Sequence, residues 1–211
     1  MVIAMCNAYD IGKKIRPGHR ALWEKSTRDR LADLPKTHTI RKTNPGLVVQ
    51  LDESGEIVPE IMRWGFSRKF NPCINNARAD KIVAGKSMWS PAWESGRRCL
   101  IPVEAFYEWS GPKGSKQAHR IRATDIDDDH WMWMAGVWER SSDPELGLCY
   151  SMVTTTPNPA MEPIHNRMPV IVPFDRTEGY LRDDDPLELL EPYAGDLETP
   201  ECESPLKAAK G

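Results

Sequence analysis

Short apolar runs separated by turn-forming residues dominate the chain, and this pattern predicts many short β-strands. Turns are predicted at 52–56 and 111–114, where Gly, Asp and Pro cluster. Pro102 indicates an edge strand or a bulge, because proline cannot donate a hydrogen bond to a neighbouring strand. The predicted strands occupy residues 47–51, 98–109, 131–138 and 150–155.

Helical patterns are fewer. The longest predicted helix spans 10–35 and ends at Pro35, and shorter ones are expected over 80–88, after Asn158 and near 187–190. The 18 prolines also argue against a helical bundle. We therefore predict an α+β fold, a single domain with a curved, mostly antiparallel, barrel-like sheet and short flanking helices.

Composition narrows the class of protein. Apolar residues make up 40% of the 211 residues and charged residues 28%, which is typical of globular domains. No apolar run is long enough to span a membrane, and the N-terminal stretch lacks the features of a secretory signal. Five cysteines without paired spacing favour a reduced cytosolic protein over a disulfide scaffold. No metal-binding motif is present, and Asp127 to His130 is interpreted as a solvated turn.

Charge is distributed unevenly along the chain. Residues 1–125 hold 22 Lys and Arg against 13 Asp and Glu, whereas residues 126–211 hold 6 against 18. A basic first part could form an anion-binding face that the overall charge of −3 conceals. Chance segregation without a shared surface is an equally good explanation at this stage.

Cys6 is the first candidate for chemistry. A lone cysteine is usually a small buried hydrophobe, but Met5 directly precedes this one and could be the translation start. Removing Met5 would leave an α-amine, with a pKa of about 8, beside a thiol with a pKa of about 8.5. Such a 1,2-aminothiol can capture an aldehyde, first as a Schiff base and then as a five-membered thiazolidine ring.

Two further segments contain candidate acid–base groups. Glu108 lies among the aromatic residues of 106–109, so an apolar pocket could raise the pKa of its carboxyl, although an outward-facing Glu on a strand is the simpler interpretation. His165 precedes Asn166 and Arg167 on a predicted loop, where catalytic groups are common, but a structural histidine would look the same. The amide of Asn76 and the guanidinium of Arg78 suit a phosphate or sugar oxygen.

Taken together, five segments resemble the SRAP family, also called the SOS-response-associated peptidase family. No single segment is specific for this family, but the occurrence of all five in the family's order along residues 5–195 is specific for it. The strings Phe-Tyr-Glu-Trp and His-Asn-Arg-Met-Pro carry most of the likeness. The five segments are residues 5–7, 63–65, 75–80, 97–109 and 154–171.

The resemblance implies a mechanism and a partner. Cys6 would bond covalently to abasic sites in single-stranded DNA as part of the DNA-damage response, with Glu108 moving protons for Schiff-base formation. His165 would assist sugar-ring opening, and Asn76 would orient the amine or the opened sugar. No cofactor or metal is expected, and the protein would be a cytoplasmic, nucleoid-associated monomer. The DNA-binding residues would be Trp64, Asn76, Arg78, Trp109 and Arg167.

The resemblance also sets the expected domain limits. Residues 1–5 would be removed or not translated, because a peptide bond at the Cys6 nitrogen would prevent ring closure. Residues 6–195 would form the domain, and 196–211 a loose acidic tail. Two other functions stay open: a cysteine peptidase with Cys6 as thiolate and His165 as base, acting on other proteins or only on its own prefix, and a non-catalytic binding module.

Overall fold

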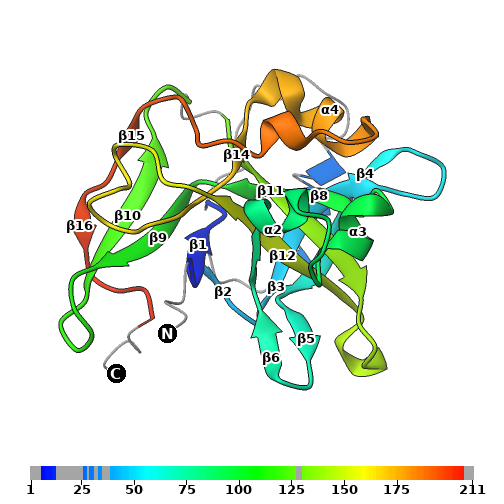
Figure 1. Cartoon of the computed structure of the whole chain (residues 1–211), viewed down its shortest axis with the longest axis horizontal. Coiled ribbons are helices and arrows are strands. Elements are labelled where there is room, and N and C mark those ends of the chain that lie inside the picture. The colour runs from blue at the N-terminus through cyan, green and yellow to red at the C-terminus, as the bar shows by residue number, and fades with distance from the viewer. Residues whose placement is uncertain are drawn as a thin grey trace.

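Two curved sheets form the body of the protein (Figure 1). The computed structural model describes residues 6–12, 26–27, 29–30, 33–34, 39–126 and 130–206. One sheet has the strand order β15-β10-β9-β1-β2, with β16 also paired to β10. Its strands are β1 (Ala8–Asp10), β2 (Thr39–Arg41), β9 (Ala105–Ser110), β10 (Gln117–Ala123), β15 (Leu197–Glu198) and β16 (Glu201–Cys202).

The other sheet closes on itself as a five-stranded mixed barrel, in the order β12-β4-β3-β8-β11 and back to β12. Only the β12–β4 pair is parallel within this ring. The predicted class, α+β with a mostly antiparallel barrel-like sheet, is thereby confirmed. The barrel strands are β3 (Pro45–Leu51), β4 (Ile57–Trp64), β8 (Arg98–Val103), β11 (Met132–Arg140) and β12 (Leu148–Thr155).

Three short strands extend the barrel sheet. β7 (Asn76–Arg78) runs parallel to β12, and β13 (Met168–Pro169) runs antiparallel to it. β14 (Ile171–Val172) pairs with β11. Thus the C-terminal part of β12 pairs both with the strand that begins at Asn76 and with the strand that follows His165.

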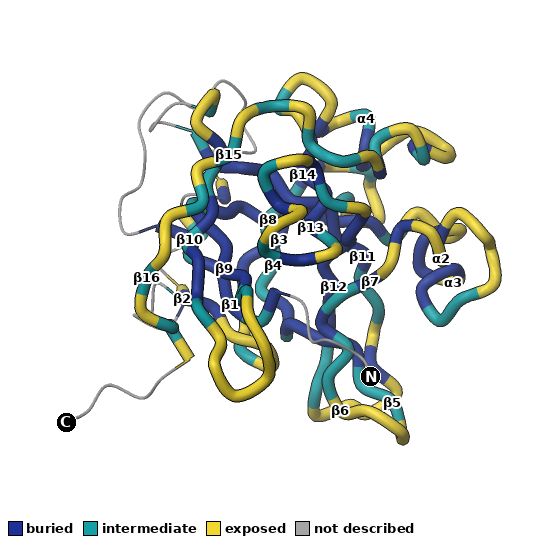
Figure 2. Tube along the Cα trace, turned by 60° about the vertical axis from the view of Figure 1, so that its left-hand side comes forward, coloured by how far each residue is buried: buried dark blue, intermediate teal, exposed yellow. Residues whose placement is uncertain are grey.

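Alternation along the barrel strands divides the core into two clusters, because successive side chains point to opposite faces. Val49 and Leu100 belong to a cluster that includes helix residues, whereas Val48 and Ile101 pack with residues of the other sheet such as Phe106. β8 is buried along its whole length, and its sequence is continuously apolar after Arg98. Figure 2 shows these strands as the buried centre of the molecule.

The helices are short and lie around the barrel (Figure 1). The α-helices whose full bounds lie within the described residues are α2 (Ala79–Val83), α3 (Ser90–Glu94) and α4 (Thr177–Arg182). The 3₁₀-helices are η2 (Pro144–Leu146), η3 (Phe174–Arg176) and η4 (Leu187–Leu189). No helix in the described ranges is both long and apolar enough to cross a membrane.

Several sequence predictions need correction. The predicted strand 98–109 is in fact two strands, β8 and β9, with a bend at Glu104 between them. The N–H of Glu104 donates to the carbonyl of Asp10 at 2.7 Å. Pro102 lies in the central strand β8 and not at an edge. The pairing of β8 with β3 ends at Leu100, so on that side no strand lies opposite Pro102 to need its N–H. The helix after Asn158 is a series of turns instead, since the prolines of this segment interrupt the backbone hydrogen bonds.

The ends of the chain also differ from expectation. Asp10 belongs to β1, and of the predicted helix 10–35 only 26–27 and 29–30 are described as helical; most of it lies outside the described residues. The predicted helix over 80–88 is shorter, ending before Gly85, whose φ is +65°. The expectation of a loose tail from residue 196 is wrong for β15 and β16, because β10 offers them an edge to pair with.

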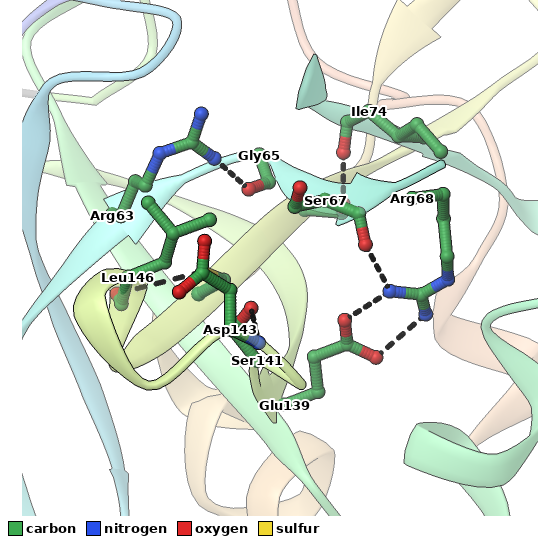
Figure 3. Close-up of polar contacts among 11 residues, drawn as sticks. Arg63, Gly65, Ser67, Arg68, Ile74, Glu139, Ser141, Asp143 and Leu146 are labelled. Carbon is green, nitrogen blue, oxygen red and sulfur yellow. Dashed lines mark hydrogen bonds and ion pairs between the residues drawn. The ribbon is translucent and has the colours of Figure 1, made fainter. Parts of the chain in front are cut away.

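A two-stranded hairpin of β5 (Phe66–Arg68) and β6 (Asn71–Ile74) extends away from the barrel (Figures 1 and 2). Figure 3 shows how it is anchored: Arg68 forms two hydrogen bonds with Glu139 of β11, at 2.5 and 2.8 Å. The entry turn requires Gly65, which has φ of +118° and no room for a Cβ atom beside the Cys73 sulfur. Phe70, between the two strands, is 79% exposed.

Candidate active site

The backbone nitrogen of Cys6 donates a hydrogen bond of 2.6 Å to Oε1 of Glu108. The antiparallel pairing of β1 with β9 positions the two residues, since Tyr9 lies opposite Phe106. Cys6 lies three residues before Tyr9 and Glu108 two residues after Phe106, so both lie toward the same end of the strand pair. Cys6 is fully buried and Glu108 almost fully. The structure therefore brings together the two residues that the sequence singled out as nucleophile and proton carrier.

Two consecutive asparagines hold the other side of the Cys6 backbone. Nδ2 of Asn75 donates to the Cys6 carbonyl oxygen at 2.8 Å, and Nδ2 of Asn76 donates to the same oxygen at 3.3 Å. Both asparagines follow β6 directly, where the chain enters β7. Cys6 is thus fixed on its nitrogen by Glu108 and on its carbonyl by an amide pair.

Burial controls the ionisation of Glu108. Desolvation raises the pKa of its carboxyl to about 8, although hydrogen bonds from the backbone nitrogens of Cys6 and Trp109 lower it in part. Oε2 is buried and has no hydrogen-bond partner in the described part of the chain. A carboxyl with this pKa can both accept and release a proton near neutral pH.

The Cys6 thiol is held in its protonated form. Burial, and secondarily the charge of Glu108, raise the pKa of the thiol well above its ordinary value. Its sulfur lies 3.5 Å from the carbonyl oxygen of Ala8, which accepts the weak S–H hydrogen bond. The resting site therefore holds a thiol rather than a thiolate.

His165 is oriented by a neighbour on its own loop. The backbone N–H of Arg167 donates to Nδ1 at 3.2 Å, which makes Nδ1 an acceptor and assigns the proton of the neutral ring to Nε2. Burial lowers the pKa of this histidine, and the charges of Lys116 and Arg167 lower it further. Nε2 is buried and has no partner among the described residues. Ile164, the residue before His165, packs against the core cluster to which Cys6 also belongs.

The two predicted arginines share one carboxylate. Arg78 contacts Asp80 at 2.7 Å and Arg167 contacts it at 3.2 Å. Arg167 also donates to Oγ1 of Thr154 at 3.3 Å and to the Thr154 carbonyl. The side chain of Arg78 is half exposed, whereas that of Arg167 is 13% exposed. These contacts position two guanidinium groups beside the strand that carries Asn76.

The two predicted tryptophans lie in different environments. Trp64 is fully buried, stacked 6.3 Å from Tyr150, and its Nε1 donates to the Asn75 carbonyl at 2.8 Å. It has no exposed surface for a DNA base, and the prediction of direct contact fails because the rings of Tyr9 and Tyr150 pack against the indole. Trp109 is partly exposed and lies next to Glu108.

Sequence reasoning missed three residues. The amide of Asn75 lies closer to the Cys6 carbonyl than the amide of Asn76 does. In the sequence, only the presence of two consecutive asparagines points to Asn75. Phe70 is an exposed aromatic side chain on the β5–β6 hairpin, flanked in sequence by Lys69. Lys116 follows the turn after β9 and acts electrostatically on both Glu108 and His165. The Gly-Pro-Lys-Gly sequence at 111–114 predicts only a hairpin turn.

Other features of the structure lie apart from this site. A cavity of 460 Å³ has Trp131, Phe174 and Tyr193 in its lining, and none of the four catalytic candidates lines it. Within the described ranges, no group of three or more His, Cys, Asp or Glu side chains is arranged to hold a metal ion.

The chain thus combines a closed mixed barrel with a second sheet that brings Cys6 to Glu108, next to an amide pair. The family described as "SOS response associated peptidase (SRAP)" matches residues 5–206, and the chain belongs to this family.

Similar proteins agree with this assignment. The abasic site processing protein YoqW of Bacillus subtilis is 34% identical over 160 residues, covering 71% of this chain and 69% of that protein. The abasic site processing protein HMCES of Xenopus tropicalis is 28% identical over 149 residues, covering 58% of this chain and 44% of that protein. A crystal structure of a Bordetella bronchiseptica protein has the same fold, with a TM-score of 0.73 and 22% identity, covering 94% of this chain and all of that one.

Proposed function

We propose that this protein binds single-stranded DNA and captures abasic sites covalently, as a thiazolidine formed by the amine and thiol of Cys6. The observation that carries the proposal is the 2.6 Å contact between the Cys6 nitrogen and Glu108. The names of the relatives, abasic site processing proteins, supply the substrate class. The proposal requires that residues 1–5 are absent from the active form, so that this nitrogen is a free amine.

The reaction balances without a redox step. The Cys6 amine attacks the aldehyde carbon of the opened sugar, and loss of one water gives an imine. The thiol then adds to the imine carbon while its proton passes to the nitrogen, which closes the ring. Glu108 takes a proton from the attacking amine and returns it to the departing hydroxyl, a role that suits a carboxyl whose pKa burial raises to about 8.

The remaining groups assist this chemistry. The Nε2–H of His165 is free to donate to the ring oxygen of the closed sugar, which promotes opening to the aldehyde. The amides of Asn75 and Asn76 fix the Cys6 carbonyl, so that the amine keeps its direction. Such positioning turns a bimolecular encounter into an effectively intramolecular one.

A path for the DNA strand follows from the groups around the site. Arg78 and Arg167 supply guanidinium groups for phosphates, and Trp109 and Phe70 supply partly or largely exposed rings on which bases can stack. Trp64 is left out of this path because it is buried. Its contribution is to hold Asn75 through the indole N–H.

A second candidate function is removal of the prefix by the protein itself. The Cys6 nitrogen would be the leaving group if the bond after Met5 were cut, and Glu108 is placed to protonate it. A general cysteine peptidase is less well supported, because the thiol is fully buried and its pKa is raised. Prefix removal would serve the first function, since it liberates the amine.

Intact mass spectrometry tests the main proposal. Purified protein is incubated with a single-stranded oligonucleotide that carries one abasic site. We expect protein that begins at Cys6, and a product whose mass is the sum of the two partners less one water. The variant Cys6→Ala should give no product of this mass that survives heating, because an imine without a neighbouring thiol hydrolyses back to amine and aldehyde. A crosslinking protein that still carries residues 2–5 would overturn the mechanism.

A further inference from the structure

Ser110 and His119 form a hydrogen-bonded pair that the proposed crosslinking reaction does not use. Oγ of Ser110 lies 2.8 Å from Nε2 of His119, and Nδ1 of His119 lies 3.1 Å from the carbonyl oxygen of Thr199. A carbonyl oxygen can only accept a hydrogen bond, so Nδ1 carries the proton of the neutral ring and Nε2 is an acceptor. The hydroxyl of Ser110 therefore donates to His119.

The strands around β10 hold this pair in place. Ser110 is the last residue of β9, and His119 of β10 lies directly opposite Glu108 of β9 and Glu201 of β16. Thr199 lies between β15 and β16, so the pairing of both strands with β10 brings its carbonyl to the imidazole. His119 is 9% exposed, whereas Ser110 is partly exposed. A buried base is thus oriented by the C-terminal strands toward a more accessible hydroxyl.

This arrangement has the parts of an activated serine nucleophile: a hydroxyl, a base that accepts its proton, and a third group that orients the base. Once Nε2 has taken the proton of Ser110, the positive ring is stabilised by the Thr199 carbonyl on Nδ1. The exposed side chain of Glu201, opposite His119 on the neighbouring strand, adds a carboxylate on the same face. Because a carbonyl stabilises an imidazolium less than a buried carboxylate does, the pair suits esters with good leaving groups rather than peptide bonds.

The turn after Ser110 offers a donor for the oxyanion that forms during attack on an ester. Gly111 follows Ser110 directly and has φ of +83°, a conformation that glycine adopts without steric cost. When a nucleophile stands where a strand enters a sharp turn, the backbone N–H of the next residue can donate to the substrate oxygen. Among the backbone hydrogen bonds of the described loops and turns, none is donated by Gly111. Its N–H is therefore the candidate oxyanion donor.

We propose that Ser110 and His119 form a second nucleophilic site that hydrolyses activated esters. Oγ of Ser110 attacks the ester carbonyl carbon while its proton passes to Nε2 of His119, and the alcohol leaves with that proton. Water then attacks the acyl-serine and gives a proton to Nε2, which returns it to Oγ as the carboxylic acid departs. This inference goes beyond the proposed function and does not depend on it, because no step uses Cys6.

A fluorophosphonate probe tests the site, because it labels an activated serine with loss of fluoride. The full chain is incubated with the probe, and mass spectrometry of its peptides locates the label. We expect label on Ser110 in the folded protein and none in denatured protein. Ser110→Ala should lose the label, and His119→Gln should slow labelling by about 100-fold. Ser115→Ala is the matched control and should label at the wild-type rate, since Ser115 is an exposed serine of the same turn whose side chain contacts no histidine in the described ranges.

The second measurement is hydrolysis of 4-nitrophenyl acetate, taken as the difference between the wild type and Ser110→Ala so that other nucleophiles cancel. Lowering the pH should reduce both this difference and the labelling rate, because a protonated Nε2 cannot accept the Ser110 proton. Glu108 and Glu201 flank His119 and titrate as well. Measuring His119→Gln at each pH therefore isolates the contribution of the imidazole.

The wild type alone can overturn the proposal, whatever the variants do to folding. Ser110 that labels no faster in the folded than in the denatured protein would show that the hydroxyl is not activated. Equal labelling rates in the wild type and in His119→Gln would overturn the role of His119 as base. Crosslinking to abasic DNA is measured on the same preparation, so that protein labelled at Ser110 that never crosslinks would refute the proposed function and leave this site standing.

Discussion

The nitrogen of Cys6 and the carboxylate of Glu108 are joined by a 2.6 Å hydrogen bond, although 102 positions separate the two residues in sequence. We expect Glu108→Gln to keep the shape of this contact while removing proton transfer. The crosslinking rate should fall by about 10²- to 10⁴-fold, as is usual for loss of an acid–base group. Single-turnover kinetics with abasic single-stranded DNA measure it. Glu104→Gln, a change outside the site, should leave the rate unaltered, and equal losses in both variants would contradict the assignment.

The raised pKa of Glu108 predicts how stability depends on pH. Burial raises the pKa from 4.5 in the unfolded chain to about 8 in the fold, so the folded protein binds the proton more tightly. The stabilisation is fully present below 4.5 and is lost as pH rises toward 8, at about 1.4 kcal/mol per pH unit within that window.

Denaturant unfolding at several pH values checks this prediction. Protein that retains residues 1–5 should be used, so that the Cys6 nitrogen carries no charge of its own. Glu108→Gln should remove most of the slope, because Gln does not titrate. A slope that survives the substitution would assign the pH dependence to other groups.

Asn75 should matter more for stability than Asn76. Asn75→Ala leaves the buried Cys6 carbonyl without its 2.8 Å partner, so the free energy of unfolding should fall by about 1–3 kcal/mol. Asn76→Ala removes a longer contact of 3.3 Å and should cost less stability, while both variants should crosslink more slowly. Thermal or denaturant unfolding, together with crosslinking rates, separates the two effects. Equal stability losses would mean that Asn76 shares the support of Cys6 equally.

Phe70 offers a test of the DNA path that is independent of Cys6. The ring is 79% exposed, so Phe70→Ala should change stability by less than about 0.5 kcal/mol. Affinity for undamaged single-stranded DNA should fall by about 1–3 kcal/mol if a base stacks on the ring. Val83→Ala, at an apolar side chain that is 56% exposed on α2, is the control. Fluorescence anisotropy that finds unchanged affinity for Phe70→Ala would remove the hairpin from the DNA path.

The sequence is informative where a residue's chemistry is unusual for its position. Cys6 behind a methionine, and Glu108 among aromatic residues, both stand out in the sequence itself, because short strings of residues carry that information. The main strands are also predictable, since their apolar runs are bounded by turn residues.

Long-range geometry is not predictable in the same way. Closure of the barrel depends on the parallel pairing of β4 with β12, between segments that are more than 80 residues apart, and no local pattern encodes it. The burial of Trp64 depends on this closure, because Tyr150 of β12 stacks against it. The choice between Asn75 and Asn76 depends on which amide turns toward Cys6, which residue type alone cannot tell.

The pairing of β15 and β16 with β10 has a practical consequence for work with shorter forms of the protein. These strands cover the outer edge of the hairpin that carries Glu108, and Thr199 accepts a hydrogen bond of 3.1 Å from His119. A chain cut at residue 195 would leave the backbone groups of β10 open to pairing with other molecules. Such a truncated form should both self-associate and lose DNA crosslinking, even though all four candidate catalytic side chains are still present.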